Sequence, residues 1–222
     1  MDMATEIITT AEKDIEQALW QSVRDDDNDK ALAVYHKSRI KLVSLTNLSD
    51  AEERDRNRVL AYCLMRIDDA LFSNGDTADA VNRTQEALSL AQRSEDEVQI
   101  ARCQLTLGAR LMNQGKIAEA EEHYRGILTT HMDSEVEDLI QVVGWTLITR
   151  GHLLNAKSLH DQALFVLLDA ESRLKAIDNF AGIAAANELL VKVYSNLGWS
   201  DDAQKCRRMA IKYKEKAKRE QR

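Results

Sequence analysis

The sequence predicts an all-α protein, and three observations support this prediction. The 222 residues include no proline and only eight glycines, so long helices can run without interruption. Aromatic residues make up 5% of the chain, and no stretch shows the sustained apolar–polar alternation of a half-buried strand. The third observation is a helix–turn–helix pattern that recurs along the chain, which predicts stacked helix pairs.

The pattern is clearest around Gly115, which separates two amphipathic segments. Gly108 and Ala120 are small residues on either side of this turn, so the two helices can pack closely as an antiparallel hairpin. Three further glycines are expected to form equivalent turns, and each is followed five residues later by an alanine. These pairs are Gly75 with Ala80, Gly151 with Ala156, and Gly198 with Ala203. A fifth copy fits at the N-terminal end if Asp26 takes the turn position, which places Ala31 at the small position.

This order of small, large and aromatic residues resembles the tetratricopeptide repeat (TPR) family, with Gly108, Gly115, Ala120 and Tyr124 as the best-matching unit. The resemblance implies a right-handed α-solenoid of about five antiparallel helix pairs, forming a single domain over residues 1–222. The expected pairs span 2–46, 50–94, 97–131, 135–176 and 180–220. The turn glycines are 40, 36 and 47 residues apart, whereas the family period is about 34 residues, so longer helices or loops are expected. Stacked helix pairs of another α-solenoid type are the alternative.

Helix starts are indicated by a serine followed three residues later by an acidic residue. Three pairs fit this pattern: Ser49 with Glu52, Ser94 with Glu97, and Ser134 with Glu137. Ser200 is expected to cap the last helix. A long helix is predicted from about Leu153 to Ala176, directly after the turn assigned to Gly151.

Charge is distributed unevenly along the chain. The formal net charge is −7, which argues against general nucleic-acid binding. The final stretch, which begins at Lys205 and ends at Arg222, nevertheless carries nine Lys or Arg and two Glu. It is expected to be the polar capping helix of a repeat array. The alternative is attraction of this stretch to RNA, anionic lipid or an acidic protein.

The three cysteines, Cys63, Cys103 and Cys206, show neither disulfide nor zinc-site spacing. Cys63 and Cys103 stand twelve residues before successive turn glycines, so they are predicted to be small buried apolar residues. No basic-then-apolar leader and no apolar run of about 18 residues is present, so no membrane span is expected. These features predict a cytoplasmic protein, with a nuclear location as the alternative.

No motif predicts catalysis, a metal or a cofactor. The segment from Gly108 to Lys116 has the wrong glycine spacing for a phosphate-binding loop, and Ile117 stands where Ser or Thr would bind magnesium. His152 and His160 lack the pattern of a zinc site. The sequence therefore predicts a protein that is not an enzyme.

The resemblance instead implies a partner-binding inner surface, formed mainly by the first helix of each pair. Counting from the turn glycines predicts that this surface contains Met65, Phe72, Arg102, Leu105, Met112, Asn113, Gln141, Trp145, Ile148, Lys192 and Asn196. Trp145, Phe72 and Met112 are expected to form a partly accessible anchor pocket. Some family members hold a chaperone's C-terminal carboxylate with a Lys–Asn pair. The matching positions here hold Glu16 and Trp20, Met65 and Asp69, or Leu105 and Ala109, so that mode is not expected.

The sequence thus predicts a non-enzymatic interaction module, a scaffold or adaptor that binds a peptide or helix of another protein on this surface. A peptide- or ligand-sensing regulatory module is the main alternative. An RNA-associated protein, acting through its basic end, is a weaker one. The oligomeric state and the partner's identity are left open by the sequence.

Overall fold

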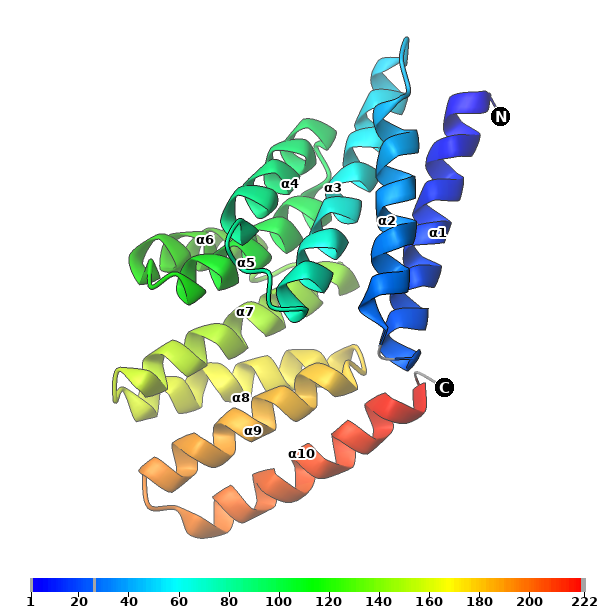
Figure 1. Cartoon of the computed structure of the whole chain (residues 1–222). Helices are drawn as coiled ribbons and strands as arrows, with labels where there is room; N and C mark the ends of the chain where they lie inside the picture. Colours follow the sequence, from blue (N-terminus) through cyan, green and yellow to red (C-terminus); the bar gives the residue numbers. More distant parts are fainter. Residues whose placement is uncertain (1, 26, 221–222) are drawn as a thin grey trace. The chain divides into compact units, whose positions relative to one another are not determined.

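The computed structural model describes residues 2–25 and 27–220, and these residues form ten helices and no strand (Figure 1). The prediction of an all-α protein is therefore confirmed. No helix in the described ranges is both long and apolar enough to span a bilayer. The helices are α1 (Met3–Asp25), α2 (Asn28–Val43), α3 (Asp50–Ser73), α4 (Ala80–Ser94), α5 (Glu97–Asn113), α6 (Ile117–His131), α7 (Glu137–Ala156), α8 (His160–Ala176), α9 (Phe180–Asn196) and α10 (Ser200–Glu220).

The helices pack in two compact units, residues 1–120 and residues 121–222, and α6 contains the boundary between them. In the first unit, α3 packs against its own partner α4 and also against α1, α2 and α5 (Figure 1). In the second unit, α7 packs against α8 and α9, and α9 packs against α8 and α10. Each unit is therefore built from helix pairs whose first helices contact one another.

The core of the first unit includes Cys63 and Cys103, as the sequence predicted. Both thiols are fully buried, and burial raises the pKa of each to about 12. A thiol with so high a pKa stays protonated at neutral pH, and the protonated form is a poor nucleophile. These cysteines therefore act as small apolar residues, alongside Tyr35, Leu42 and Val59.

The predicted helix caps are confirmed at one site and corrected at two. Ser49 and Glu52 form a capping box: the Ser49 N–H donates to the Glu52 carboxylate at 2.8 Å, and the Glu52 N–H donates to the Ser49 hydroxyl oxygen. Ser94 is instead the last residue of α4, and Asp96 caps α5 by accepting from the Gln99 N–H at 2.7 Å. The prediction that Ser134 caps the next helix is also wrong, because the N-cap of α7 is Val136, which makes no side-chain capping bond.

One predicted turn glycine is misplaced. Gly75, Gly115 and Gly198 have positive φ angles of 91°, 78° and 79°, as a tight helix-to-helix turn requires. Gly151, however, lies inside α7, and Ser158 takes the turn position with φ of 60°. A Cβ atom at Gly151 would lie 2.5 Å from Cγ of Leu167 in α8, so this glycine allows close helix packing. The sequence pattern could not separate these two uses of glycine.

The corrected turn changes the repeat register. The four turn residues are now 40, 43 and 40 residues apart, and the helix expected from Leu153 begins at His160. The small residue five positions after each turn is Ala80, Ala120, Ala163 or Ala203, and each is buried. Ala156, predicted at this position, is exposed. Asp26, assigned to the first turn, lies outside the described residues.

Candidate functional site

In each unit, the first helices of the pairs leave the same set of positions accessible. Residues 17, 13, 9, 6 and 2 positions before the turn residue are half-buried or exposed in all four repeats that have a described turn residue. At 3.6 residues per turn, these positions fall within an arc of about 80° on the helix. We call the accessible positions of the first helices in each unit the first-helix face of that unit. In the first unit it comprises Arg58, Tyr62, Arg66, Asp69 and Ser73 of α3, with Val98, Arg102, Thr106, Ala109 and Asn113 of α5. In the second unit it comprises Gln141, Trp145, Thr149, His152 and Ala156 of α7, with Ala181, Ala185, Leu189, Lys192 and Asn196 of α9.

Six of the sequence-predicted binding residues lie on this face. They are Arg102, Asn113, Gln141, Trp145, Lys192 and Asn196.

The other five predicted residues lie ten or three positions before a turn residue, beside the face. Met65 and Ile148 are only 2% and 6% exposed, so their assignment to the partner surface was wrong. The Met65 sulfur lies 3.0 Å from the Gln99 amide nitrogen of α5, which shows that this position points towards the neighbouring first helix. Phe72, Leu105 and Met112 are half-buried at the edge of the face.

Tyr62 lies at the centre of the charged part of the face in the first unit. Burial raises the pKa of Tyr62, the nearby Arg66 and Arg102 lower it, and Glu16 and Glu12 raise it. The Arg66 guanidinium lies 5.3 Å from the centroid of the Tyr62 ring. A half-buried phenol is thus surrounded by charges of both signs.

Arg58 is held on the same face by α1. Its guanidinium donates to both carboxylate oxygens of Glu12, at 2.5 and 3.0 Å. Hydrogen bonding to Glu12 raises the pKa of Arg58 further. The pair joins α1 to α3 and places a paired cation beside Tyr62.

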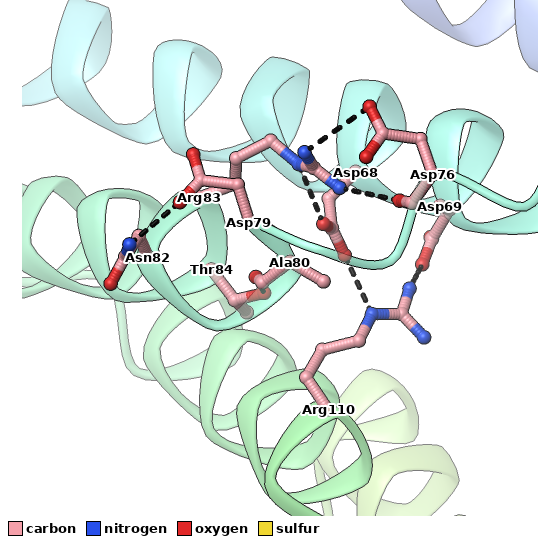
Figure 2. Close-up of polar contacts among 9 residues, drawn as sticks. All are labelled: Asp68, Asp69, Asp76, Asp79, Ala80, Asn82, Arg83, Thr84 and Arg110. Atoms are coloured by element: carbon pink, nitrogen blue, oxygen red, sulfur yellow. Dashed lines mark hydrogen bonds and ion pairs between the residues drawn. The ribbon is translucent and has the colours of Figure 1, made fainter. Parts of the chain in front are cut away.

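A buried ion-pair network lies beneath the first-helix face of the first unit and includes Asp69 of that face (Figure 2). The Asp68 side chain is fully buried and accepts from Arg83 Nε at 3.0 Å and from Arg110 Nε at 2.6 Å. Figure 2 shows the two arginines approaching this carboxylate from α4 and α5. Arg110 also donates to Asp69 at 2.6 Å, and its guanidinium lies 3.9 Å from the centroid of the Phe72 ring. The network therefore fixes Asp69 and Phe72. No local sequence pattern predicts this network, because its members come from three helices.

The face in the second unit is more apolar. Trp145 and Thr149 of α7 are half-buried, as are Ala185 and Leu189 of α9, while Lys192 is exposed. At the end of this face, the Asn196 side-chain amide donates to the Asn155 side-chain oxygen at 3.0 Å. An indole, aliphatic side chains and a lysine on one face can provide both apolar contact and hydrogen bonding.

The histidines considered in the sequence do not come together with metal ligands. His160 lies 2.8 Å from the Asn155 side-chain oxygen, and His152 is exposed on the first-helix face. Within residues 2–25 and 27–220, no three His, Cys, Asp or Glu side chains are grouped so that they could hold a metal ion.

A cleft of about 530 Å³ in the second unit was missed by the sequence reasoning. It lies between α6, α7 and α8, and its α7 residues include Leu147, Arg150 and Leu154. By helical geometry these residues are on the opposite side of α7 from Gln141 and Trp145. No local pattern identifies this cleft, because its walls come from two different helix pairs.

Comparison with known proteins shows similarity in structure only. No family model and no curated protein matches the sequence. The Rap conjugation gene regulator of plasmid pLS20, solved in complex with the Phr* peptide, aligns with 92% of this chain at a TM-score of 0.72 and 19% identity. This chain covers 53% of that regulator, about half of its length.

Two other solved structures have the same fold. A kinesin-light-chain-type protein from Podosopora anserina, with nearly identical TPR-like repeats, aligns over 99% of both chains at a TM-score of 0.60 and 14% identity. A Rap protein complexed with Competence and Sporulation Factor aligns with 94% of this chain and 66% of its own, at a TM-score of 0.52 and 13% identity. The chain therefore has a TPR-like helical repeat fold, as its sequence predicted.

Proposed function

We propose that this chain is a non-enzymatic protein interaction module, a scaffold or adaptor, which binds an extended peptide or a helix of a partner protein on the first-helix face. The observation that carries the proposal is that the same first-helix positions are accessible in four helix pairs, two in each unit. Thirteen residues before the turn, these positions hold Tyr62 and Arg102 in the first unit, and Trp145 and Ala185 in the second. Tyrosine, arginine and tryptophan are the residue types that most often dominate binding energy at interfaces.

Two solved Rap structures support this proposal: one is in complex with the Phr* peptide, and the other is complexed with Competence and Sporulation Factor. They also favour a second candidate, a regulatory module that senses a peptide and changes the packing of its helix pairs. A cytoplasmic or nuclear location is part of both proposals. All three cysteines are free thiols, two of them buried and one half-buried, which supports a location inside the cell, where thiols stay reduced.

Trp145→Ala tests the proposal, after partners have been purified from the native cell with the wild-type protein. Truncating an interface anchor often costs 2 kcal/mol or more, about a thirtyfold loss of affinity. We expect the variant to keep its helicity and melting temperature while losing the partner. Trp199→Ala is the matched control, because Trp199 is 50% exposed and lies outside the first-helix face.

Two results would contradict the proposal. A Trp145→Ala protein that unfolds would place Trp145 in the core and remove the centre of the proposed site. A folded variant that retains the partner would show that binding occurs elsewhere. Hydrogen exchange then separates the two candidates: a sensor changes exchange in helices remote from the peptide, whereas an adaptor is protected only at the contact.

A further inference from the structure

We propose that the cleft between α6, α7 and α8 is a second binding site, which takes an acidic amphipathic peptide segment of a partner protein. This site lies on the opposite side of α7 from the first-helix face. It does not depend on the function proposed above, since none of the residues that line it belongs to that face.

The cleft has an apolar interior of suitable size. Its volume of about 530 Å³ is within the range of ligand pockets, about 300–1,000 Å³. Leu147 and Leu153 of α7 and Tyr124 of α6 are buried residues at its wall. Phe165 of α8 also lines it, yet this phenylalanine is 76% exposed. A large apolar side chain exposed at the edge of an apolar cleft offers contact area to a partner.

The charges around the cleft are not balanced. Its two carboxylates already have partners in this chain: Glu121 pairs with Lys157 at 2.5 Å, and Asp169 pairs with Arg173 at 2.9 Å. Two arginines at the cleft, Arg125 and Arg150, are exposed, and neither makes an ion pair or hydrogen bond with any part of the chain that the structure describes. The cleft therefore presents two uncompensated positive charges around an apolar interior.

This combination selects the chemistry of the occupant. Apolar side chains would enter the cleft and contact Phe165, and carboxylates would bind the guanidinium groups of Arg125 and Arg150, whose planar forks match carboxylate geometry. The two arginines come from α6 and α7, so an occupant with several carboxylates can pair with each of them separately. A fatty acid has one carboxylate, which the two arginines would have to share. An amphipathic peptide with acidic residues beside its apolar anchors supplies both features.

The test is a selection from a library of short displayed peptides with Leu, Ile, Met or Phe at helically spaced positions and equal proportions of acidic and basic residues elsewhere. We expect the wild-type protein to enrich acidic sequences. The best peptide is then synthesised, and its affinity is measured at increasing salt concentrations. Its binding should weaken as salt rises, because the ion pairs lie at the protein surface.

Variants identify the site. Combining Arg125→Glu with Arg150→Glu, or replacing Phe165 in Phe165→Ala, is expected to lower affinity for the selected peptide by about tenfold or more. The matched controls are Arg207→Glu with Arg208→Glu, and Ile211→Ala; all three residues are exposed on α10 in the same unit. These controls should bind like the wild type. If charge reversal impairs folding, Arg125→Gln with Arg150→Gln gives the same comparison.

Three outcomes would overturn the proposal. Enrichment of uncharged or basic peptides would contradict the charge argument. Affinity that stays within about twofold of the wild type in both folded cleft variants would exclude the cleft as the site. Displacement of the peptide by dodecanoate, with binding of dodecanoate itself lost in the arginine variants, would make the occupant a fatty acid.

Discussion

Asp68 shows how one residue can connect three helices. Its carboxylate is fully buried in α3, and its partners Arg83 and Arg110 are 16% and 10% exposed in their side chains. A buried ion pair gains little over an apolar contact of the same shape, but the loss of one member leaves the other charges buried and unpaired. Asp68 therefore links both α4 and α5 to α3 through one buried side chain.

We predict that Asp68→Ala lowers the free energy of unfolding by about 3–5 kcal/mol, because it leaves two nearly buried guanidinium groups without their shared partner. Urea denaturation followed by circular dichroism measures this change. Asp76→Ala is the control: its carboxylate is 52% exposed, 3.7 Å from Arg83, and its removal should cost about 1 kcal/mol or less. Equal effects from the two substitutions would show that the buried network contributes nothing specific.

At the scale of the helix pair, the turn residue determines which side chains meet. A turn at Ser158, seven residues after Gly151, places Ala163 where the sequence pattern had placed Ala156. Ala163 and Ala120 are completely buried at equivalent positions in successive pairs, whereas Ala156 is exposed. Small residues at these buried positions allow the two helices of a pair to approach closely.

We predict that Ala120→Leu and Ala163→Leu each lower the free energy of unfolding by about 1–3 kcal/mol, because the larger side chain overpacks the helix crossing. Ala156→Leu is the matched substitution at an exposed position and should change stability by no more than about 0.5 kcal/mol. Thermal melts of the three variants measure the difference. If Ala156→Leu were instead the most destabilising of the three substitutions, Gly151 rather than Ser158 would be the turn residue.

At the scale of the whole molecule, the chain is acidic overall but ends in the basic helix α10. Lys212, Lys214, Lys216 and Lys218 are exposed on this helix. Two of them contact α9: Lys214 forms an ion pair with Glu188, and the Lys216 amine lies 4.6 Å from the centroid of the Phe180 ring. Exposed contacts of these kinds each contribute about 1 kcal/mol or less.

Replacing these four lysines by glutamine is therefore expected to leave the protein folded, with its helicity unchanged. The same change should abolish any binding to RNA or to anionic vesicles, since α10 holds the basic cluster of the chain. Gel shifts with RNA and co-sedimentation with phosphatidylserine vesicles measure this binding. Binding that persists in the variant would place the nucleic-acid or lipid contact on another surface.

Local patterns in the sequence were enough to predict much of the fold. The absence of proline, the helical spacing of apolar residues and the glycines at 75, 115 and 198 predicted the all-α repeat class, because backbone preferences depend on nearby residues. They also predicted the burial of Cys63 and Cys103. Six of the eleven candidate binding residues, including Trp145, were placed on the accessible face by spacing alone.

The tertiary structure decided everything that depends on contacts between different helices. It placed Gly151 against Leu167 and gave the turn to Ser158, because a glycine can serve either close packing or a positive φ angle. It buried Met65 against α5, and it brought Asp68, Arg83 and Arg110 together from three helices. It also formed the cleft that Arg125, Arg150 and Phe165 line. The lining residues of this cleft come from two helix pairs and share no pattern along the chain.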